Sequence, residues 1–215
     1  MSRRGKINFL FLGIITIFLF NHGCSKKDKV THQNFFDVKE YSFYSESLGK
    51  WTKKIKIYND LDTELIAEAT YKSKEFRTAY NELYSKVYKL DSAEKNKIIN
   101  DQIVASEISN EFILSAYIPN EKLNDFNKKD SIWKIYLCKN GDENKIEPVE
   151  IREIRKKEEF IKFFYTYTSP WKKIYIIRFP IYYPKTEKKI IENSPFKLII
   201  TSVLGSGEMI WASEK

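Results

Sequence analysis

The chain of 215 residues contains only two cysteines and two histidines. The cysteines are Cys24 and Cys138, and the histidines are His22 and His32. A histidine-dependent triad, an H-E-x-x-H zinc site or a Cys/His metal cluster needs partners that these scattered residues do not have. We therefore predict no bound metal and no other cofactor, and we read Cys138 as a half-buried structural thiol.

Glycine is also scarce, with seven residues in the chain. No glycine-rich phosphate loop is present, because Gly205-x-Gly207 lacks both the lysine and the following helix that such a loop requires. Nucleotide chemistry is therefore not expected.

The first twenty residues have the pattern of an export signal. Arg3, Arg4 and Lys6 precede the almost wholly apolar stretch Ile7–Phe20. Fourteen helical residues span roughly 21 Å, which is short of a hydrocarbon core of about 30 Å. A cleaved signal therefore fits better than an uncleaved signal anchor, which is the alternative.

The apolar stretch ends at Asn21-His22-Gly23-Cys24. A small residue directly before a cysteine at this place resembles the lipobox of bacterial lipoproteins, and the relaxed form with Asn21 and His22 is similar to that of spirochaetal lipoproteins. The resemblance implies cleavage after Gly23 and attachment of diacylglycerol to Cys24. It covers about the first 25 residues and says nothing about the folded part of the chain.

Removal of the predicted signal peptide, residues 1–23, leaves 192 residues with a net charge of +5, that is 34 basic against 29 acidic residues. The lysines are spread among acids, so we interpret them as solvated surface and predict no nucleic-acid partner. Residues 24–37 are polar and aperiodic, which predicts a lipidated flexible tether. Residues 38–215 are then a single domain.

Period-two patterns predict strands over much of that domain. Within residues 63–71 and 111–118 every second position on one side is apolar, namely Leu65, Ala67, Ala69 and Tyr71, then Phe112, Leu114, Ala116 and Ile118. Asn140-Gly141 predicts a hairpin that joins two strands within residues 131–154, and Pro148 marks the second of these as an edge strand or a bulge.

Further strands are predicted at residues 51–58, 172–179 and 196–204, and Gly205-Ser206-Gly207 is predicted to turn the last of these back into residues 208–213. The prolines of residues 180–195 predict a loop. We therefore predict a mainly β fold, an antiparallel immunoglobulin-like β-sandwich of about seven or eight strands.

A helical insertion interrupts the strands at about residues 74–109. Ser73 is placed to cap a first amphipathic helix over residues 74–90, and Asp91 with Glu94 predicts a capping box. The box opens a second helix, whose apolar positions are Ile98, Ile99, Ile103 and Ile108. A shorter helix is predicted at residues 157–164.

Two acidic clusters could in principle supply calcium ligands, namely Asp60 with Asp62 and Glu64, and Asp125 with Asn127 and Asp130. Neither has the glycine and terminal glutamate of a calcium loop, so we interpret both as turns. Aromatic residues could stack on sugars, but their alternation along strands favours core packing.

We predict a lipid-anchored protein of the cell envelope, attached to a membrane through lipid on Cys24, with the outer membrane favoured over the inner. It is expected to bind or to make structural contacts with an envelope protein or polysaccharide partner. The alternatives are a hydrolase of envelope polymers with paired carboxylates, which 29 acids leave open, and a surface protein that meets host molecules.

Overall fold

The computed structural model describes residues 38–142, 144–154, 158–192 and 194–212, which belong to one compact unit. The predicted signal peptide with Gly23, and the predicted tether with the lipidation residue Cys24, lie outside these residues. Within the described ranges, no helix combines the length and the apolar character needed to cross a membrane.

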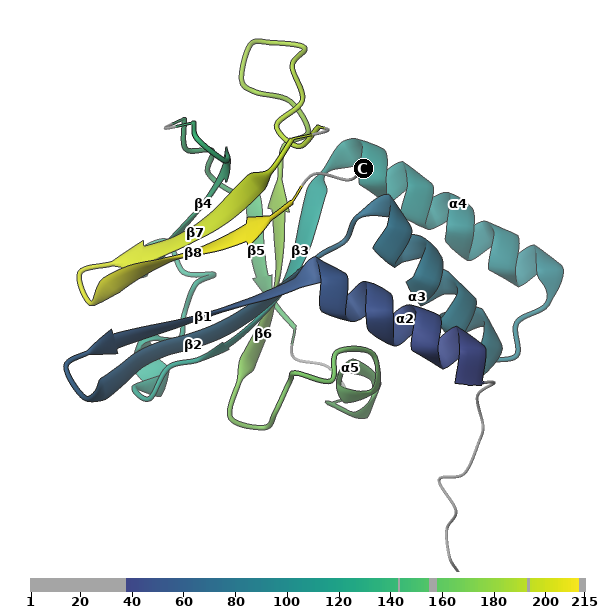
Figure 1. The fold of residues 1–215 in the computed structure, drawn as a ribbon, viewed down its shortest axis with the longest axis horizontal. Helices are drawn as coiled ribbons and strands as arrows, with labels where there is room; N and C mark the ends of the chain where they lie inside the picture. The colour runs from purple at the N-terminus through teal and green to yellow at the C-terminus, as the bar shows by residue number, and fades with distance from the viewer. Residues whose placement is uncertain (1–37, 143, 155–157, 193, 213–215) are drawn as a thin grey trace, which may run out of the picture. The chain divides into compact units, whose positions relative to one another are not determined.

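Helices and strands share the described chain (Figure 1). The helices are α2 (Val38–Trp51), α3 (Lys74–Val87), α4 (Ser92–Ile108) and α5 (Glu158–Phe164), with a short 3-10 helix at Glu121–Leu123. The strands are β1 (Thr52–Asn59), β2 (Asp62–Tyr71), β3 (Asn110–Tyr117), β4 (Lys134–Lys139), β5 (Glu150–Glu153), β6 (Lys173–Phe179), β7 (Phe196–Ser202) and β8 (Gly205–Trp211). The fold is thus mixed α and β, where the sequence predicted a mainly β fold.

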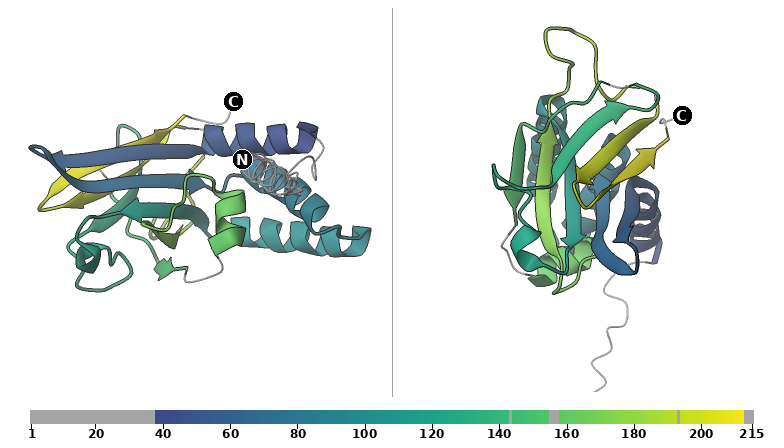
Figure 2. Two further views of the ribbon diagram at one scale, coloured as in Figure 1. Left: turned by 90° about the horizontal axis from the view of Figure 1, so that it is seen from below. Right: turned by 90° about the vertical axis from the view of Figure 1, so that its left-hand side faces the viewer.

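The strands form two antiparallel sheets. The larger has the order β1-β2-β3-β6-β5 and the smaller the order β4-β7-β8, and β1 lies beside β8. Figure 2 shows the helices gathered at one end of the strands and the β1–β2 and β7–β8 turns at the other. The immunoglobulin-like class, the finer part of the fold prediction, stays a prediction.

The core lies between the two sheets. Leu65, Ala67 and Ala69 are buried on the predicted face of β2. From β3, the ring of Phe112 lies 5.5 Å from that of Trp211 in β8 and 6.3 Å from that of Phe196 in β7. The period-two pattern therefore identified the inner face of the large sheet correctly.

Strand β3 differs from the prediction of a half-buried strand, because it is buried on both faces. It is the central strand of the large sheet, and its outer face is covered by residues that follow α5. Tyr167 is one of them, and its hydroxyl donates to the carbonyl oxygen of Ile113 at 3.3 Å. Polar β3 residues on this outer face, such as Glu111 and Ser115, are consequently shielded from water.

The predicted hairpin at Asn140-Gly141 is correct in its turn and wrong in its second strand. Gly141 has a positive φ of 83°, and Leu137 and Ile146 exchange two backbone hydrogen bonds of 2.9 Å. The next backbone hydrogen bond of this ladder would need an N–H at position 148, but Pro148 has none. The chain therefore leaves β4, and β5 pairs with β6 at the edge of the other sheet.

The β7–β8 hairpin is confirmed, but its glycines do not make the turn. Gly205 begins β8, and a Cβ atom there would lie 2.4 Å from Cγ2 of Ile57. At Gly207 the corresponding distance to Cδ1 of Ile55 is 3.0 Å. The two glycines therefore let β8 approach β1 where the sheets meet.

The helical insertion is confirmed with both of its caps. The Ser73 side chain accepts a hydrogen bond from the N–H of Phe76, and Asp91 forms a reciprocal capping box with Glu94. Helix α5 is also confirmed. Helix α2 was missed, although Tyr44, Leu48 and Trp51 are buried at helical spacing. It packs against α3, where the Tyr44 ring lies 5.8 Å from that of Phe76.

The junction between the sheets yields a test of stability. We expect Gly205→Ala to lower the free energy of unfolding by about 2 kcal/mol, because the methyl group meets Ile57 and the φ of 140° disfavours side chains. Denaturant unfolding of the full chain measures this change.

Gly49 is the matched control. It lies in α2, and a Cβ atom added there would have no other atom within 4 Å, so Gly49→Ala should raise the stability by about 0.5 to 1 kcal/mol. Equal effects of the two substitutions would contradict the close approach of β8 to β1.

Candidate functional site

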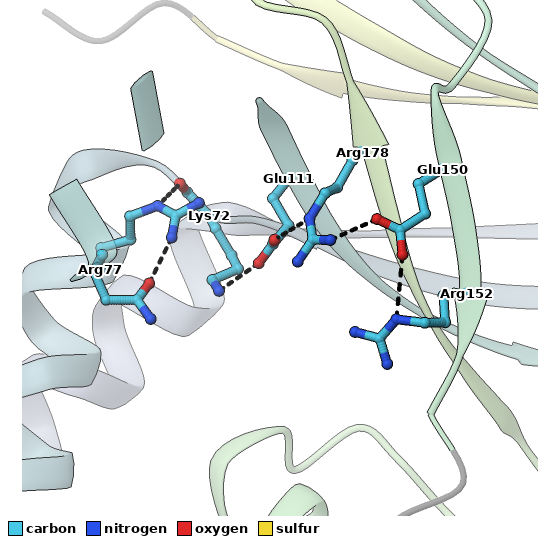
Figure 3. Close-up of polar contacts among 7 residues, drawn as sticks. Lys72, Arg77, Glu111, Glu150, Arg152 and Arg178 are labelled. Carbon is cyan, nitrogen blue, oxygen red and sulfur yellow. Dashed lines mark hydrogen bonds and ion pairs between the residues drawn. The ribbon is translucent and has the colours of Figure 1, made fainter. Parts of the chain in front are cut away.

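A row of alternating charges crosses the outer face of the large sheet next to the helices (Figure 3). Lys72 follows β2 and pairs with Glu111 of β3, and Nε of Arg178 in β6 lies 2.8 Å from the other Glu111 oxygen. Arg178 also pairs with Glu150 of β5, which is 3.2 Å from Nε of Arg152. Antiparallel register places Arg178 opposite Glu111 on one side and opposite Glu150 on the other.

Glu111 is the buried centre of this row, with 4% of its surface exposed. Burial alone would raise the pKa of its carboxyl group, but the charges and hydrogen bonds of Lys72 and Arg178 outweigh burial and lower the pKa to about 2. Burial lowers the pKa of Lys72, and the neighbouring Glu111 opposes that shift. The carboxylate and its two hydrogen-bonded partners form an ion-pair group, and the charge of Arg77 also lowers the pKa of Glu111.

Arg77 of α3 is also buried, with 4% of its surface exposed, but it is held differently. Its Nε donates to the carbonyl oxygen of Lys72 at 2.9 Å, and its Nη1 donates to Oε1 of Gln102 in α4 at 2.5 Å. Its Nη2 is buried and has no hydrogen-bond partner among the described residues. The guanidinium is thus fixed in place with one nitrogen unused.

Arg77 begins a polar stripe along α3 that continues with Asn81 and Ser85, each four residues further on. All three are buried, and neither Oδ1 of Asn81 nor Oγ of Ser85 has a partner within the described ranges. The apolar positions Phe76 and Leu83 contribute to the core. Helix α3 therefore has an apolar stripe in the core and a second stripe that is buried and polar.

Arg77 and Asn81 line a cavity of about 330 Å³ between α3 and α4, which we call the α3–α4 cavity. Its other lining residues are Lys74, Thr78 and Glu82 of α3 and Ile99, Gln102, Ile103, Ser106 and Glu107 of α4. The volume lies at the lower end of the range for small-molecule sites. A few polar groups facing apolar side chains are typical of such sites.

The cavity also explains why α4 departs from its predicted packing. The apolar positions Ile98, Ile99, Ile103 and Ile108 were expected to form a buried face, yet no residue of α4 is buried. Ile103 is 50% exposed and Ile108 is 70% exposed. Two of the four, Ile99 and Ile103, face the cavity instead of a core.

A second cavity of about 340 Å³ lies beside the first and shares Lys74 and Ser106 with it. Lys72 and Lys189 also line it, as does Trp51, whose Nε1 is buried without a partner in the described part of the chain. Both cavities therefore combine basic side chains with a buried polar group that lacks a partner.

The buried carboxylates do not suit acid catalysis. Burial would raise the pKa of Glu68, but its hydrogen bonds with Lys172 and Lys54 lower that pKa. The pKa of Glu111 is lowered by its own basic partners in the same way. A glycosidase acid requires the opposite shift, because it must be protonated near neutral pH. Paired carboxylates of this kind stabilise the fold rather than transfer protons.

The remaining sequence candidates are placed as follows. Gly23 and Cys24 lie outside the described residues. Cys138 is free and buried, and burial raises the pKa of its thiol. Within the described ranges no group of three acidic, histidine or cysteine residues can hold a metal ion.

Arg77 and Asn81 were not identified from the sequence as functional residues. The available signal was their spacing with Ser85, which places three polar side chains on one stripe of a helix. Spacing alone does not distinguish such a stripe from a solvated helix face. Only the packing of α4 over it shows that the stripe is buried.

Comparison with known proteins gives little further information. No protein-family model matches the chain, and no curated protein matches it. Among solved structures, the chain is similar to a protein of unknown function from Burkholderia pseudomallei K96243, with a TM-score of 0.43 and 10% sequence identity. The alignment covers 80% of this chain and 83% of that chain. What the chain does must therefore be inferred from its own residues.

Glu111 yields a prediction for stability and its pH dependence. We expect Glu111→Gln to lower the free energy of unfolding at pH 7 by about 3 kcal/mol, because Lys72 and Arg178 lose a buried counter-charge. The pKa of this carboxyl is about 2 in the folded chain against an ordinary value of 4.5. Its contribution is therefore complete above about pH 4.5 and is lost as the pH falls towards 2.

Urea unfolding of both proteins at pH 7 and at pH 3 measures this difference, which should shrink at the lower pH. Glu150→Gln is the control, because Glu150 is partly exposed and should contribute at most about 1 kcal/mol. An unchanged difference at pH 3 would contradict the assignment to Glu111.

Asn81 yields the opposite kind of prediction. We expect Asn81→Leu to raise the free energy of unfolding of the ligand-free protein by about 1 kcal/mol, because it removes a buried oxygen that has no partner among the described residues. Chemical denaturation at pH 7 measures the change.

The control is Asn124, which is 3% exposed. Its side chain donates to the Ala116 carbonyl at 2.9 Å and accepts from the Tyr175 hydroxyl at 3.0 Å. Asn124→Leu should therefore lower the stability by about 2 kcal/mol. A loss of stability in both variants would mean that Oδ1 of Asn81 is satisfied in solution.

Proposed function

We propose that the chain is a binding module of the cell envelope, held at a membrane by lipid on Cys24, with the α3–α4 cavity as its ligand site. The observation that carries the binding role is that two residues lining this cavity, Arg77 and Asn81, each have a buried polar atom, Nη2 and Oδ1, that has no partner among the described residues. Buried polar groups are normally satisfied, so exceptions that share a cavity point to a missing partner.

The anchoring part of the proposal rests on the N-terminal sequence. Basic residues, a short apolar stretch and Gly23-Cys24 follow one another as they do in bacterial lipoproteins. Several acyl chains on one cysteine would hold the chain firmly, since each buried methylene contributes about 0.8 kcal/mol. We place the anchor in the outer membrane.

An immunoglobulin-like sandwich belongs to the same proposal. Two antiparallel sheets face each other across Phe112, Phe196 and Trp211, an arrangement that supports this class of fold. Binding modules are often built on such a scaffold, with the ligand at one end of the strands. Here the helical insertion occupies that place between β2 and β3.

Binding is favoured over hydrolysis by the state of the buried carboxylates. Glu68 and Glu111 are both committed to lysine or arginine partners, and their pKa values are lowered. A partner of the envelope, such as a protein or a polysaccharide, can supply the ligand.

The anchor is tested by Cys24→Ala in detergent phase partitioning. We expect the wild-type protein in the detergent phase and the variant in the aqueous phase, because the variant has no thiol for lipid attachment. The fold of residues 40–215 should be unchanged by circular dichroism.

Intact mass of the membrane-extracted wild-type protein gives the second measurement. It should correspond to a chain that begins at Cys24 and carries acyl chains. An unmodified chain that begins at Met1, or a variant that stays in the detergent phase, would show that the apolar stretch itself is the anchor.

A further inference from the structure

We infer that the α3–α4 cavity binds an amphiphilic carboxylate that has an N–H group next to its carboxylate, as N-acylated amino acids do. This inference rests on the proposed function and names the ligand class of the same site. Three features of the cavity carry it: the free nitrogen of Arg77, the free oxygen of Asn81, and the apolar wall supplied by α4.

The buried guanidinium of Arg77 favours an anionic ligand. Its guanidinium is fixed by Lys72 and Gln102 through neutral acceptors. Burial lowers the pKa of Arg77, and the nearby Glu111 carboxylate, whose charge raises that pKa, is hydrogen-bonded to Lys72 and Arg178 instead. A buried charge without a direct counter-charge is costly, and a ligand carboxylate at Nη2 would relieve that cost with a charge-assisted hydrogen bond. Because one nitrogen is left, the site fits a single carboxylate oxygen.

The surrounding charges favour the same ligand. Lys74 lines the cavity at its exposed end, and Arg77 lines it as a buried residue. Of the two acids that line it, Glu82 is paired with Lys95 at 2.8 Å and Glu107 is exposed. The buried end of the cavity therefore keeps a positive charge.

Oδ1 of Asn81 favours a ligand with a hydrogen-bond donor. Its Oδ1 accepts hydrogen bonds, and no described residue donates to it. Arg77 and Asn81 are four residues apart on α3, so their side chains are neighbours on one helix face. A ligand that reaches both must accept a hydrogen bond from Arg77 at one atom and donate a hydrogen bond to Asn81 from another atom close by. A carboxylate with an amide N–H one carbon away has this pattern.

The isoleucines of α4 that line the cavity favour a ligand with an apolar chain. Ile99 and Ile103 face the cavity, and Ile103 is 50% exposed. An aliphatic ligand chain would cover these side chains and remove their surface from water. Helix α4 has no buried residue and contacts α3, so it can close on such a chain without disturbing the core.

The test uses three probes of equal chain length. N-hexanoylglycine has the carboxylate, the N–H and the apolar chain; O-hexanoylglycolate has an ester oxygen in place of the N–H; N-hexanoylglycinamide has a neutral amide in place of the carboxylate. Each is titrated calorimetrically into the full chain in lipid nanodiscs, with empty nanodiscs as the blank. We expect N-hexanoylglycine to bind about 3- to 10-fold more tightly than O-hexanoylglycolate and about 10- to 100-fold more tightly than N-hexanoylglycinamide.

Two variants on α4 localise the binding. Ile103→Glu places a like charge at the cavity mouth and should weaken N-hexanoylglycine about tenfold. Val104→Glu is the matched control, because Val104 is 55% exposed on the same helix but does not line the cavity. It should change the affinity by less than about twofold. Both positions are exposed, so neither substitution endangers folding.

Two variants on α3 assign the polar contacts. Arg77→Met should weaken both carboxylates about 10- to 100-fold and leave N-hexanoylglycinamide unchanged. Asn81→Leu should abolish the preference for N-hexanoylglycine over O-hexanoylglycolate. A preference that survives Asn81→Leu would overturn the role of the N–H.

The outcomes separate the ligand class from the binding role. If N-hexanoylglycinamide binds as tightly as N-hexanoylglycine, or if none of the three probes binds, the inferred class is wrong, while the proposed binding role is not affected. If Val104→Glu weakens binding as much as Ile103→Glu, the cavity is not the site and the proposed function fails with it.

Discussion

The carboxylate of Glu111 is the contact on which the arrangement of helices and sheet depends. It lies on the central strand with 4% exposure, and it holds Lys72 and Arg178 on either side. A buried carboxylate of this kind must keep its counter-charges, because separation would leave an unpaired charge in a dry interior. Lys72 directly precedes the cap residue Ser73, so this ion pair also positions the start of α3 over the sheet.

The ion pair between Lys72 and Glu111 also determines how Arg77 is held beside the cavity. Because Lys72 is fixed, its carbonyl oxygen is fixed, and that oxygen accepts from Nε of Arg77. Gln102 of α4 accepts from the next nitrogen, which leaves Nη2 without a partner among the described residues. A polar stripe at this place gives up apolar packing between α3 and α4, since an apolar stripe would have let α4 bury its isoleucines against α3. Local rules of stability are often broken at functional sites, and the α3–α4 cavity breaks them in this way.

Local chemistry explains which features could be predicted from the sequence. Caps such as Ser73 and Asp91 act within a few residues, and strand alternation reports only which face is apolar, so both were predictable. The change of sheet after Pro148 depends on a partner strand far along the chain, although the missing N–H was visible. Arg77 and Glu111 were not identified, because their burial results from the packing of α4 and of residues after α5, which no local pattern encodes.

The proposed anchor at Cys24 and the proposed ligand site involve different residues, yet the physics of amphiphiles connects them. A molecule with an apolar chain and one carboxylate partitions into a bilayer surface, so its concentration there exceeds that in the surrounding water. A module held at the same surface by Cys24 would meet its ligand at that higher effective concentration. Modest affinity from one guanidinium, one amide and two isoleucines would then be enough for occupancy. A half-open cavity formed by a loosely packed helix suits such a ligand better than a closed, high-affinity pocket would, because the ligand must also be able to leave.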